Sequence, residues 1–275
     1  MQPLPSPPPD YRTLLDYRAP EDLLAGRVIL VTGAAQGIGR AVALRYARHG
    51  ATLVLLDWDR KGLESLNDEI LAQGRGEALL CPADLSGITI VGLREIADHI
   101  GQRLGRLDGL LNNAAWIGAL APFEHYPPAT WTKVMNINMA APFFLTQWCM
   151  PLLHKADDPV VGFSLQEASR AYWGGFALAK AAQEALIGVL VDEYHAHSAH
   201  PVRLFGIDTG PVMTPGRRLH YPGETIDAHP RPEHVTGPYL YAMGPEARGH
   251  SPLLLRAAPG RDALQAPAGP GNAGA

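Results

Sequence analysis

Apolar residues form two kinds of pattern along this chain: short uninterrupted runs and four-residue repeats. The first run, residues 28–31, is followed by glycines and then by Ile38, Val42 and Tyr46. An uninterrupted run is typical of a parallel strand buried on both faces, and four-residue spacing is typical of a helix packed along one face. The pattern therefore predicts a strand that leads directly into a helix.

The same alternation continues along the chain, beginning with a second apolar run at 51–56. Strands that alternate with helices favour a single α/β domain, a Rossmann-type doubly wound parallel sheet of about seven strands in a three-layer α/β/α arrangement. Further strands are expected at 78–81, 107–111, 160–164 and 202–207, and helices at 61–73, 88–104, 131–153 and 173–194. The 131–153 helix is expected to bend near Pro142.

Glycines at the first strand–helix junction indicate the kind of ligand. Gly33 permits a tight turn, Gly37 has no Cβ to keep a pyrophosphate from the backbone, and Gly39 allows close packing of helix on strand. The first turn of the helix then offers unpaired N–H groups to an anion. The predicted ligand is a dinucleotide.

Asp57 follows the second strand, where an acidic residue can accept hydrogen bonds from the adenosine ribose hydroxyls. The same carboxylate would repel a 2′-phosphate, so NAD is favoured over NADP. The alternative is that Asp57 is a solvated loop carboxylate.

Composition and charge narrow the range of partners. With 275 residues, of which 47% are hydrophobic and 18% charged, one sizeable core can form, and a single domain over 11–258 is expected. A net charge of −4 with interspersed signs argues against a nucleic-acid partner. Cys81 and Cys149 lack metal-site spacing, and His195, His197 and His200 have no fixed carboxylate nearby, so no metal is expected.

The termini and the absence of long apolar runs lead to expectations about location. No run approaches the roughly 20 residues that a membrane helix needs, so neither a membrane partner nor a location outside the cytoplasm is expected. Residues 1–10 are rich in proline and 259–275 in Ala, Pro and Gly, which predicts disordered tails. Residues 11–26 are expected to pack loosely against the domain.

Three motifs resemble the short-chain dehydrogenase/reductase family: Thr-Gly-x-x-x-Gly-Ile-Gly at 32–39, Asn-Asn-Ala-Ala at 112–115, and Asn-Ile-Asn at 136–138. The resemblance covers about 24–259, with 232–243 similar to the family's late helix and 252–257 to its last strand. It implies hydride transfer between a nicotinamide cofactor and an alcohol or carbonyl substrate. Cofactor contacts are expected from Thr32, Gly33, Gln36, Gly37, Ile38, Gly39, Asp57, Asp84, Asn113, Lys180, Gly210 and Thr214.

The resemblance also implies individual roles. Asp84 would bind the adenine amino group, although an aspartate there can equally cap a helix. Trp116 would lie at the rear of the nicotinamide pocket or be a half-exposed packing residue. Asn138 would perturb its helix and hold a water of a proton relay, or else bond to its own backbone. Lys180 would hold the nicotinamide ribose.

The chain departs from the family at the positions that carry catalysis. The Tyr-x-x-x-Lys pair stands as Phe176 and Lys180, so the lysine is present and the tyrosine is not. The family's serine, thirteen residues before the tyrosine, falls on Phe163, and Ser164 would take its place only if the strand end slipped by one residue. Tyr172, one helical turn before Phe176, is a possible substitute acid.

The departures lead to an expectation of impaired hydride transfer in an NAD-binding protein of oxidoreductase ancestry. The alternatives are an active oxidoreductase that uses Tyr172 or a lysine-bound water as donor, and a non-catalytic NAD-binding protein. Residues 217–232 are expected to form a substrate-covering flap. Apolar residues in 140–153 and 173–194 exceed what one-sided packing needs, so a homodimer or homotetramer is expected.

Overall fold

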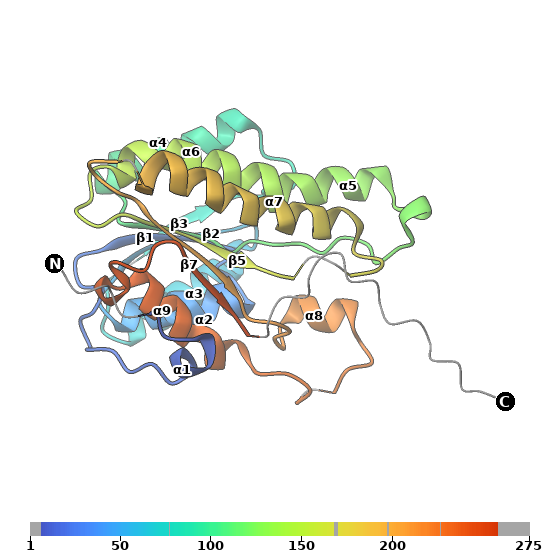
Figure 1. Ribbon diagram of the computed structural model, residues 1–275, viewed down its shortest axis with the longest axis horizontal. Coiled ribbons are helices and arrows are strands. Elements are labelled where there is room, and N and C mark those ends of the chain that lie inside the picture. Colours follow the sequence, from blue (N-terminus) through green and yellow to red (C-terminus); the bar gives the residue numbers. More distant parts are fainter. Residues whose placement is uncertain (1–6, 77, 168–169, 197, 226, 258–275) are drawn as a thin grey trace.

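Seven parallel strands form one sheet in the order β3-β2-β1-β4-β5-β6-β7 (Figure 1). The structure is a computed structural model that describes residues 7–76, 78–167, 170–196, 198–225 and 227–257. The order reverses between β1 and β4, which is where an open sheet of this kind leaves a crevice at the carboxyl ends of its strands. The strands are β1 (Val28–Thr32), β2 (Thr52–Asp57), β3 (Leu79–Pro82), β4 (Gly109–Asn112), β5 (Val160–Leu165), β6 (Arg203–Asp208) and β7 (Leu253–Arg256).

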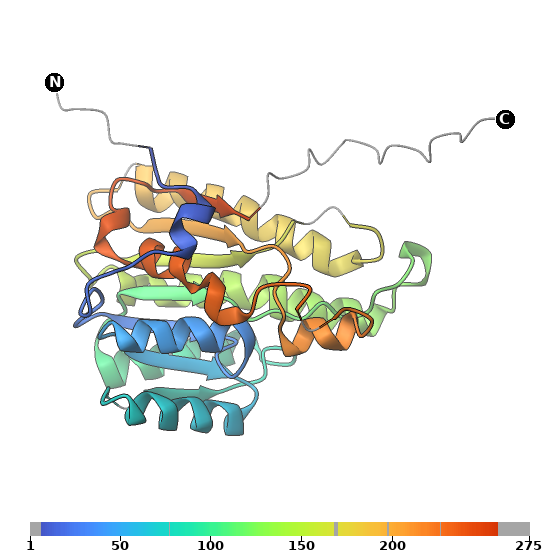
Figure 2. The ribbon, with the colours of Figure 1, turned by 90° about the horizontal axis from the view of Figure 1, so that it is seen from below.

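Helices cover both faces of the sheet, as the predicted three-layer fold requires (Figures 1 and 2). One layer holds α4 (Ile90–Leu104), α5 (Pro128–Met135), α6 (Ala141–Leu153) and α7 (Gly174–Val191). The other holds α1 (Tyr11–Leu15), α2 (Gly37–Arg48), α3 (Arg60–Ala72) and α9 (Thr236–Met243), while the short α8 (Pro215–His220) lies beside the carboxyl ends of the strands. The fold predicted from the hydrophobic pattern is confirmed.

A hydrophobic core lies on each side of the sheet, because the central strands are buried on both faces. All five residues of β1 and all four of β4 are buried. Side chains of β1 alternate between the two cores: Ile29 and Val31 pack toward α2 and α9, and Leu30 packs toward α4 and α6. This packing fixes the strand ends on which the candidate site is built.

The segment before the first strand packs more firmly than expected. Asp10 caps α1 by accepting a 2.7 Å hydrogen bond from the Thr13 N–H. Tyr11, Leu14 and Leu24 are buried in the core that includes α9. Loose packing was therefore the wrong expectation for 11–26, and the reason is that these apolar side chains fill a groove beside α9. Residues 1–6 and 258–275, where most of the predicted tails fall, lie outside the described residues.

Within the described residues, one helical segment, Gly174–Ala196, is long and apolar enough to cross a membrane when judged by length and composition alone. It comprises α7 and a π-helical turn, Asp192–Ala196. Its inner face packs on β5 and β6 and carries the buried Lys180 and Gln183. That packing identifies it as a core helix of the sheet.

Candidate cofactor-binding site

The glycine loop between β1 and α2 closes in a way that only glycines allow. Gly33 and Gly37 have φ of +67° and +59°, in the left-handed region that disfavours side chains. A Cβ on Gly33 would lie 2.8 Å from the Ala114 Cα, and a Cβ on Gly39 would lie 2.1 Å from the Gly33 carbonyl oxygen. The loop is therefore a backbone cradle at the start of α2, as predicted, and its open N–H groups suit a phosphate.

Thr32 and Asn113 join the ends of β1 and β4. The Thr32 hydroxyl accepts hydrogen bonds from the backbone N–H groups of Asn113 and Ala114, at 2.9 and 3.0 Å. The Asn113 side-chain amide donates to the carbonyls of Thr32 and Gly33, at 3.0 and 3.3 Å. Thr32 is 2% exposed, so its role is to hold the cradle rather than to contact a ligand directly.

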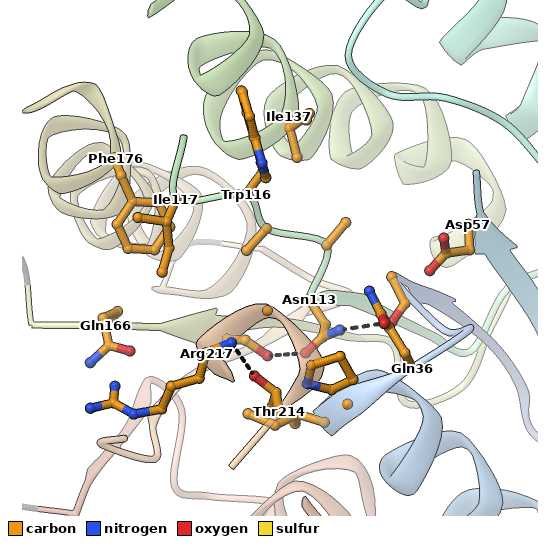
Figure 3. Close-up of a pocket in the computed structure, with 18 of the residues that line it drawn as sticks. Gln36, Asp57, Asn113, Trp116, Ile117, Ile137, Gln166, Phe176, Thr214 and Arg217 are labelled. Atoms are coloured by element: carbon orange, nitrogen blue, oxygen red, sulfur yellow. Dashed lines mark hydrogen bonds between the residues drawn. The ribbon is translucent and has the colours of Figure 1, made fainter. Parts of the chain in front are cut away.

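A cavity of about 580 Å³ runs along the carboxyl ends of the strands, large enough for a bound organic cofactor (Figure 3). In the view of Figure 3, Asp57 lies on one side and Phe176 and Arg217 lie on the other. Of the twelve residues expected to contact a cofactor, the lining includes Gly33, Gln36, Gly37, Ile38, Asp57, Asp84, Asn113, Lys180, Gly210 and Thr214.

Asp57 lies at the end of β2, 7% exposed, and is oriented by backbone donors. Its carboxylate accepts hydrogen bonds from the N–H groups of Ala35, at 3.0 Å, and of Asp59, at 3.1 Å. Trp58, the next residue, is 71% exposed and also lines the cavity. The carboxylate is thus a fixed acceptor built into the cavity wall, rather than a solvated loop group.

Asp84 lines the same end of the cavity and also shapes the turn that follows β3. Its carboxylate accepts a 2.8 Å hydrogen bond from the Ser86 N–H. The N-cap of α4 is Thr89, whose hydroxyl accepts from the Gly92 N–H. The alternative role of Asp84 as a helix cap therefore does not apply.

Lys180 is 3% exposed and reaches the cavity from α7. Its ammonium donates to the Ser164 carbonyl at 2.7 Å and to the Gln183 side-chain oxygen at 3.0 Å. Burial lowers the pKa of Lys180 to about 8, against the opposing charge of Asp208. The lysine is consequently a desolvated cation that loses its charge just above neutral pH.

Asn138 lies inside a π-helical turn, Asn136–Ala140, which separates α5 from α6 in the predicted 131–153 helix. Its side-chain amide donates to the carbonyls of Trp116 and Val134, both at 2.9 Å, and its oxygen accepts from the Trp116 N–H at 3.1 Å. Both interpretations of Asn138 therefore hold in part. The residue lies in a perturbed stretch of helix, and its side chain also donates to a backbone carbonyl of the same helical segment, that of Val134. Trp116 is half-buried and lines the cavity.

Strand β5 keeps its alternation to the end, which separates the two candidate serine positions. Phe163 is fully buried in the core beneath α6 and α7. Ser164 faces the other side, where its hydroxyl donates to the Asn113 side-chain oxygen at 3.0 Å and lies 3.0 Å from the Tyr239 hydroxyl. Among the described lining residues of the cavity are Ser164 and Phe176 but not Phe163, so the end of β5 presents Ser164 rather than Phe163 to the cavity.

Phe176 is 4% exposed and lies on the cavity wall, where its ring packs against Trp173 at 5.3 Å between centroids. The Lys180 ammonium lies 5.8 Å from the centre of the Phe176 ring. Tyr172 is 60% exposed and absent from the cavity lining in the described residues. The geometry therefore argues against Tyr172 as the substitute acid, because an acid must come within hydrogen-bond reach of the reacting group.

Residues from the predicted flap close one end of the cavity. Thr214 caps α8 by accepting a 3.1 Å hydrogen bond from the Arg217 N–H, as Figure 3 shows. The Arg217 guanidinium makes a bidentate ion pair with Glu224, at 2.6 and 2.5 Å. Trp173 donates its indole N–H to the Tyr221 hydroxyl at 3.0 Å. These bonds tie the flap to itself and to the start of α7.

Three residues at the site were missed in the sequence. Tyr239 from α9 is the only tyrosine among the described lining residues, and burial raises its pKa. Trp58 adds an aromatic face beside Asp57. Gln183 contacts Lys180, and its position three residues after the lysine on the same helix was the signal available. Among the described residues, no group of three or more His, Cys, Asp or Glu is placed to hold a metal.

The observations above fit a nicotinamide dinucleotide in this cavity. The cradle at Gly33 and Gly37 would be filled by a Cβ, and the same cavity is lined by Asp57 and Lys180, an acceptor and a donor of the kind that ribose hydroxyls bind. When bound, the nicotinamide would supply a hydride acceptor or donor.

Comparisons with known proteins agree with this picture. Residues 27–224 match the model of the short chain dehydrogenase family. The chain is 35% identical to the uncharacterised oxidoreductase YciK of Escherichia coli K12 over 250 residues, which cover 90% of this chain and 98% of that protein.

Solved structures give the same result. A short chain dehydrogenase from Pseudomonas syringae is 39% identical, with a TM-score of 0.84 over 88% of this chain and 99% of that one. A short chain dehydrogenase from Shigella flexneri, complexed with NADP, is 35% identical, with a TM-score of 0.82 over 87% and 100% of the two chains.

Proposed function

Because this chain belongs to the short-chain dehydrogenase/reductase family, we propose that it binds NAD and that its transfer of hydride to or from an alcohol or carbonyl substrate is impaired. The single observation that carries the proposal is the contrast within one cavity. The residues that would hold a dinucleotide line it together, whereas Phe176 lies on its wall at the position expected for the catalytic tyrosine, and the hydroxyl of the lining residue Ser164 is engaged by Asn113 and Tyr239.

The residues of this chain divide into two groups by what they can do. Gly33, Gly37 and the first turn of α2 would bind the pyrophosphate, Asp57 the adenosine ribose, and Lys180 the second ribose. Reduction of a carbonyl also needs a proton donor within reach, and phenylalanine has no proton to give. Loss of such a donor typically lowers a rate by about 10² to 10⁴.

The preference for NAD rests on Asp57. A 2′-phosphate carries negative charge, and a buried carboxylate beside it needs a cation to offset the repulsion. The cationic lining residues come from α5, α7 and α8, as Lys133, Lys180 and Arg217, whereas β2 and the following Trp58 contribute none. The related Shigella flexneri protein was crystallised with NADP, so the cofactor of this chain needs direct measurement.

An active enzyme with a substituted donor is the second candidate. Tyr239 is the described lining tyrosine, but its hydroxyl pairs with Ser164 and burial raises its pKa, which makes it a weak acid. Water held by Lys180 is the other donor that the alternative requires. We rank this candidate below impaired transfer because the Tyr239 hydroxyl is engaged by Ser164 and has a raised pKa, and water is itself a weak acid.

The test combines cofactor binding with turnover. We expect NADH to bind the purified protein at least about tenfold more tightly than NADPH, a difference of ~1.4 kcal/mol. Asp57→Ala should bring the dissociation constants of NADH and NADPH closer together, while the exposed control Asp68→Ala on α3 should leave their ratio unchanged. Turnover with ketones, aldehydes and secondary alcohols should be very slow.

Two results would contradict the proposal. Equal or tighter binding of NADPH removes the role of Asp57. Rapid turnover by the wild-type protein removes the impairment and favours the second candidate.

A further inference from the structure

Gln183 links Lys180 to the π-helical turn that carries Asn138. It lies on α7, 2% exposed, and its side-chain oxygen accepts the 3.0 Å hydrogen bond from the Lys180 ammonium. Its amide N–H donates in turn to the backbone carbonyl of Asn138 in a short hydrogen bond. A continuous polar chain therefore crosses an interface between helices that is otherwise largely apolar.

The sequence explains why the Asn138 carbonyl accepts from a side chain. In an α-helix this carbonyl would accept from the N–H four residues later, which belongs to Pro142, and proline has no N–H. The π-helical turn Asn136–Ala140 marks the resulting disruption. A buried carbonyl without a hydrogen-bond donor is costly. The Gln183 side-chain amide supplies a donor to the Asn138 carbonyl in place of the missing proline N–H.

The hydrogen bonds through Gln183 give the Lys180 side chain a defined orientation. An ammonium has three N–H donors, and the described structure assigns two of them, to the Ser164 carbonyl at 2.7 Å and to Gln183. The third remains for a ligand in the cavity that Lys180 lines.

We propose that Gln183 is a positioning residue that fixes the Lys180 ammonium at the cavity wall as a ligand-binding cation. The identity of the ligand, a nicotinamide dinucleotide, rests on the proposed function. The positioning of Lys180 does not, because it follows from contacts within the chain.

The electrostatic surroundings of Lys180 make the proposal measurable. Among the groups that face it, Asp208 at the end of β6 is the charged one that acts on its pKa, whereas Ser164 on β5, Asn138 on the π-helical turn and Phe176 on α7 are uncharged. Replacing Gln183 by Glu puts a carboxylate in contact with the ammonium and should raise the Lys180 pKa. Replacing it by Leu removes an acceptor and should lower that pKa.

The first measurement uses the ligand-free full chain. Competitive acetylation of Lys180, followed by mass spectrometry across pH 6 to 11, reports the fraction of neutral amine. We expect the midpoint of the profile near the wild-type pKa of about 8, higher in Gln183→Glu and lower in Gln183→Leu. The two variants should differ by at least about one pH unit, a tenfold difference in labelling at fixed pH.

Matched controls at Gln102, an exposed residue of α4, separate this effect from a general change of charge or fold. Gln102→Glu and Gln102→Leu should keep the wild-type midpoint. Gln183→Met, which keeps the side-chain volume but accepts only weakly, should behave like Gln183→Leu and provides a second apolar variant if Leu does not fold.

The second measurement is the dissociation constant of NADH as a function of pH. A cation that binds the ligand is charged below its pKa, so affinity should fall as pH rises through the Lys180 midpoint, and this fall should move with the midpoint in each variant. Unchanged acetylation midpoints in Gln183→Glu, Gln183→Leu and Gln183→Met would overturn the proposal. Shifted midpoints without NADH binding would support the positioning of Lys180 and refute the proposed function instead.

Discussion

At the scale of single residues, the cavity wall carries a phenylalanine, Phe176, where the family resemblance predicts a tyrosine. Phe176 lies on the cavity wall 5.8 Å, ring centre to ammonium, from Lys180, and Phe163 is buried in the core beneath the same helix. Ser164 lines the cavity, and its hydroxyl donates to the Asn113 side chain and pairs with the Tyr239 hydroxyl.

Restoring the phenol is the most direct test at this scale. Phe176→Tyr adds one oxygen to a ring that lines the cavity, so it should fold with little loss of stability. The Lys180 charge would lower the pKa of the new phenol and bring it toward the working range of an acid or base. We expect turnover with NADH and a ketone panel to rise by at least about tenfold, where a fully effective group typically supplies 10² to 10⁴.

Tyr172→Phe provides the matched control for that experiment, because Tyr172 is exposed and outside the described cavity lining. Its turnover should equal that of the wild type. If the wild-type protein is active and the Tyr172→Phe variant is not, Tyr172 must reach the substrate. The flap and the start of α7 would then have to rearrange when substrate binds. Phe163→Ser is less informative alone, since removing a fully buried ring costs about 3 kcal/mol or more.

At the scale of elements, the strands β1 to β6 and the long helices followed from their hydrophobic patterns, whereas α9 and β7 were expected only from the family resemblance. The first strand, the glycine loop and Asp57 could be located because their geometry depends on neighbours along the chain. The π-helical turn at 136–140 could be expected only as a bend near Pro142. Its form depends on Trp116 and Gln183, which are distant in sequence and supply the hydrogen bonds that stabilise Asn138.

The same distinction explains the two other differences. Alternation along β5 places Phe163 and Ser164 on opposite faces, but only the cavity lining shows that Ser164 is the residue that faces the cavity. The packing of 11–26 depends on α9, more than 200 residues later, where an added Cβ on Gly237 would lie 2.0 Å from the Leu14 carbonyl oxygen. Local pattern thus predicts elements, and contacts distant in sequence decide how the side chains of the site are used.

The junction of β1, α2 and β4 gives a prediction for packing between elements. In Gly39→Ala the new methyl group would overlap the Gly33 carbonyl and the Asn113 amide, at 2.1 and 2.5 Å. Since one neighbour is backbone, α2 must move away from the strand. We expect a loss of roughly 1–3 kcal/mol in the free energy of unfolding, measured by urea denaturation, together with at least tenfold weaker NADH binding.

Gly76→Ala is the control for this change, because an added Cβ at Gly76 has no atom within 4 Å. Its stability and NADH affinity should match the wild type. Normal NADH affinity in a folded Gly39→Ala variant would mean that the cofactor does not use the cradle at the start of α2.

At the scale of the whole molecule, one helical layer presents an apolar outer surface. The layer of α4, α5, α6 and α7 covers one face of the sheet, and Figure 1 shows α6 and α7 within it. Several large apolar side chains of this layer or the turn between α5 and α6 are at least 41% exposed: Trp131, Met139, Phe143, Leu178 and Val189. Two of them, Leu178 and Val189, lie on Gly174–Ala196, which has the length and composition of a membrane helix and packs on β5 and β6.

This surface predicts that the protein associates with copies of itself through α6 and α7. Exposed apolar patches of this kind usually mark an interface. In a two-fold symmetric dimer, each subunit contributes the same exposed residues to that interface. We expect a homodimer or homotetramer by light scattering at micromolar concentration.

Val189→Lys on α7 should shift the mass to a smaller species, because burying a charge without a partner is costly. Leu71→Lys, at a similarly exposed position on α3 in the opposite layer, should leave the mass unchanged. NADH affinity separates assembly from folding: a Val189→Lys monomer that still binds NADH confines the defect to the interface, whereas a monomeric wild-type protein contradicts the prediction.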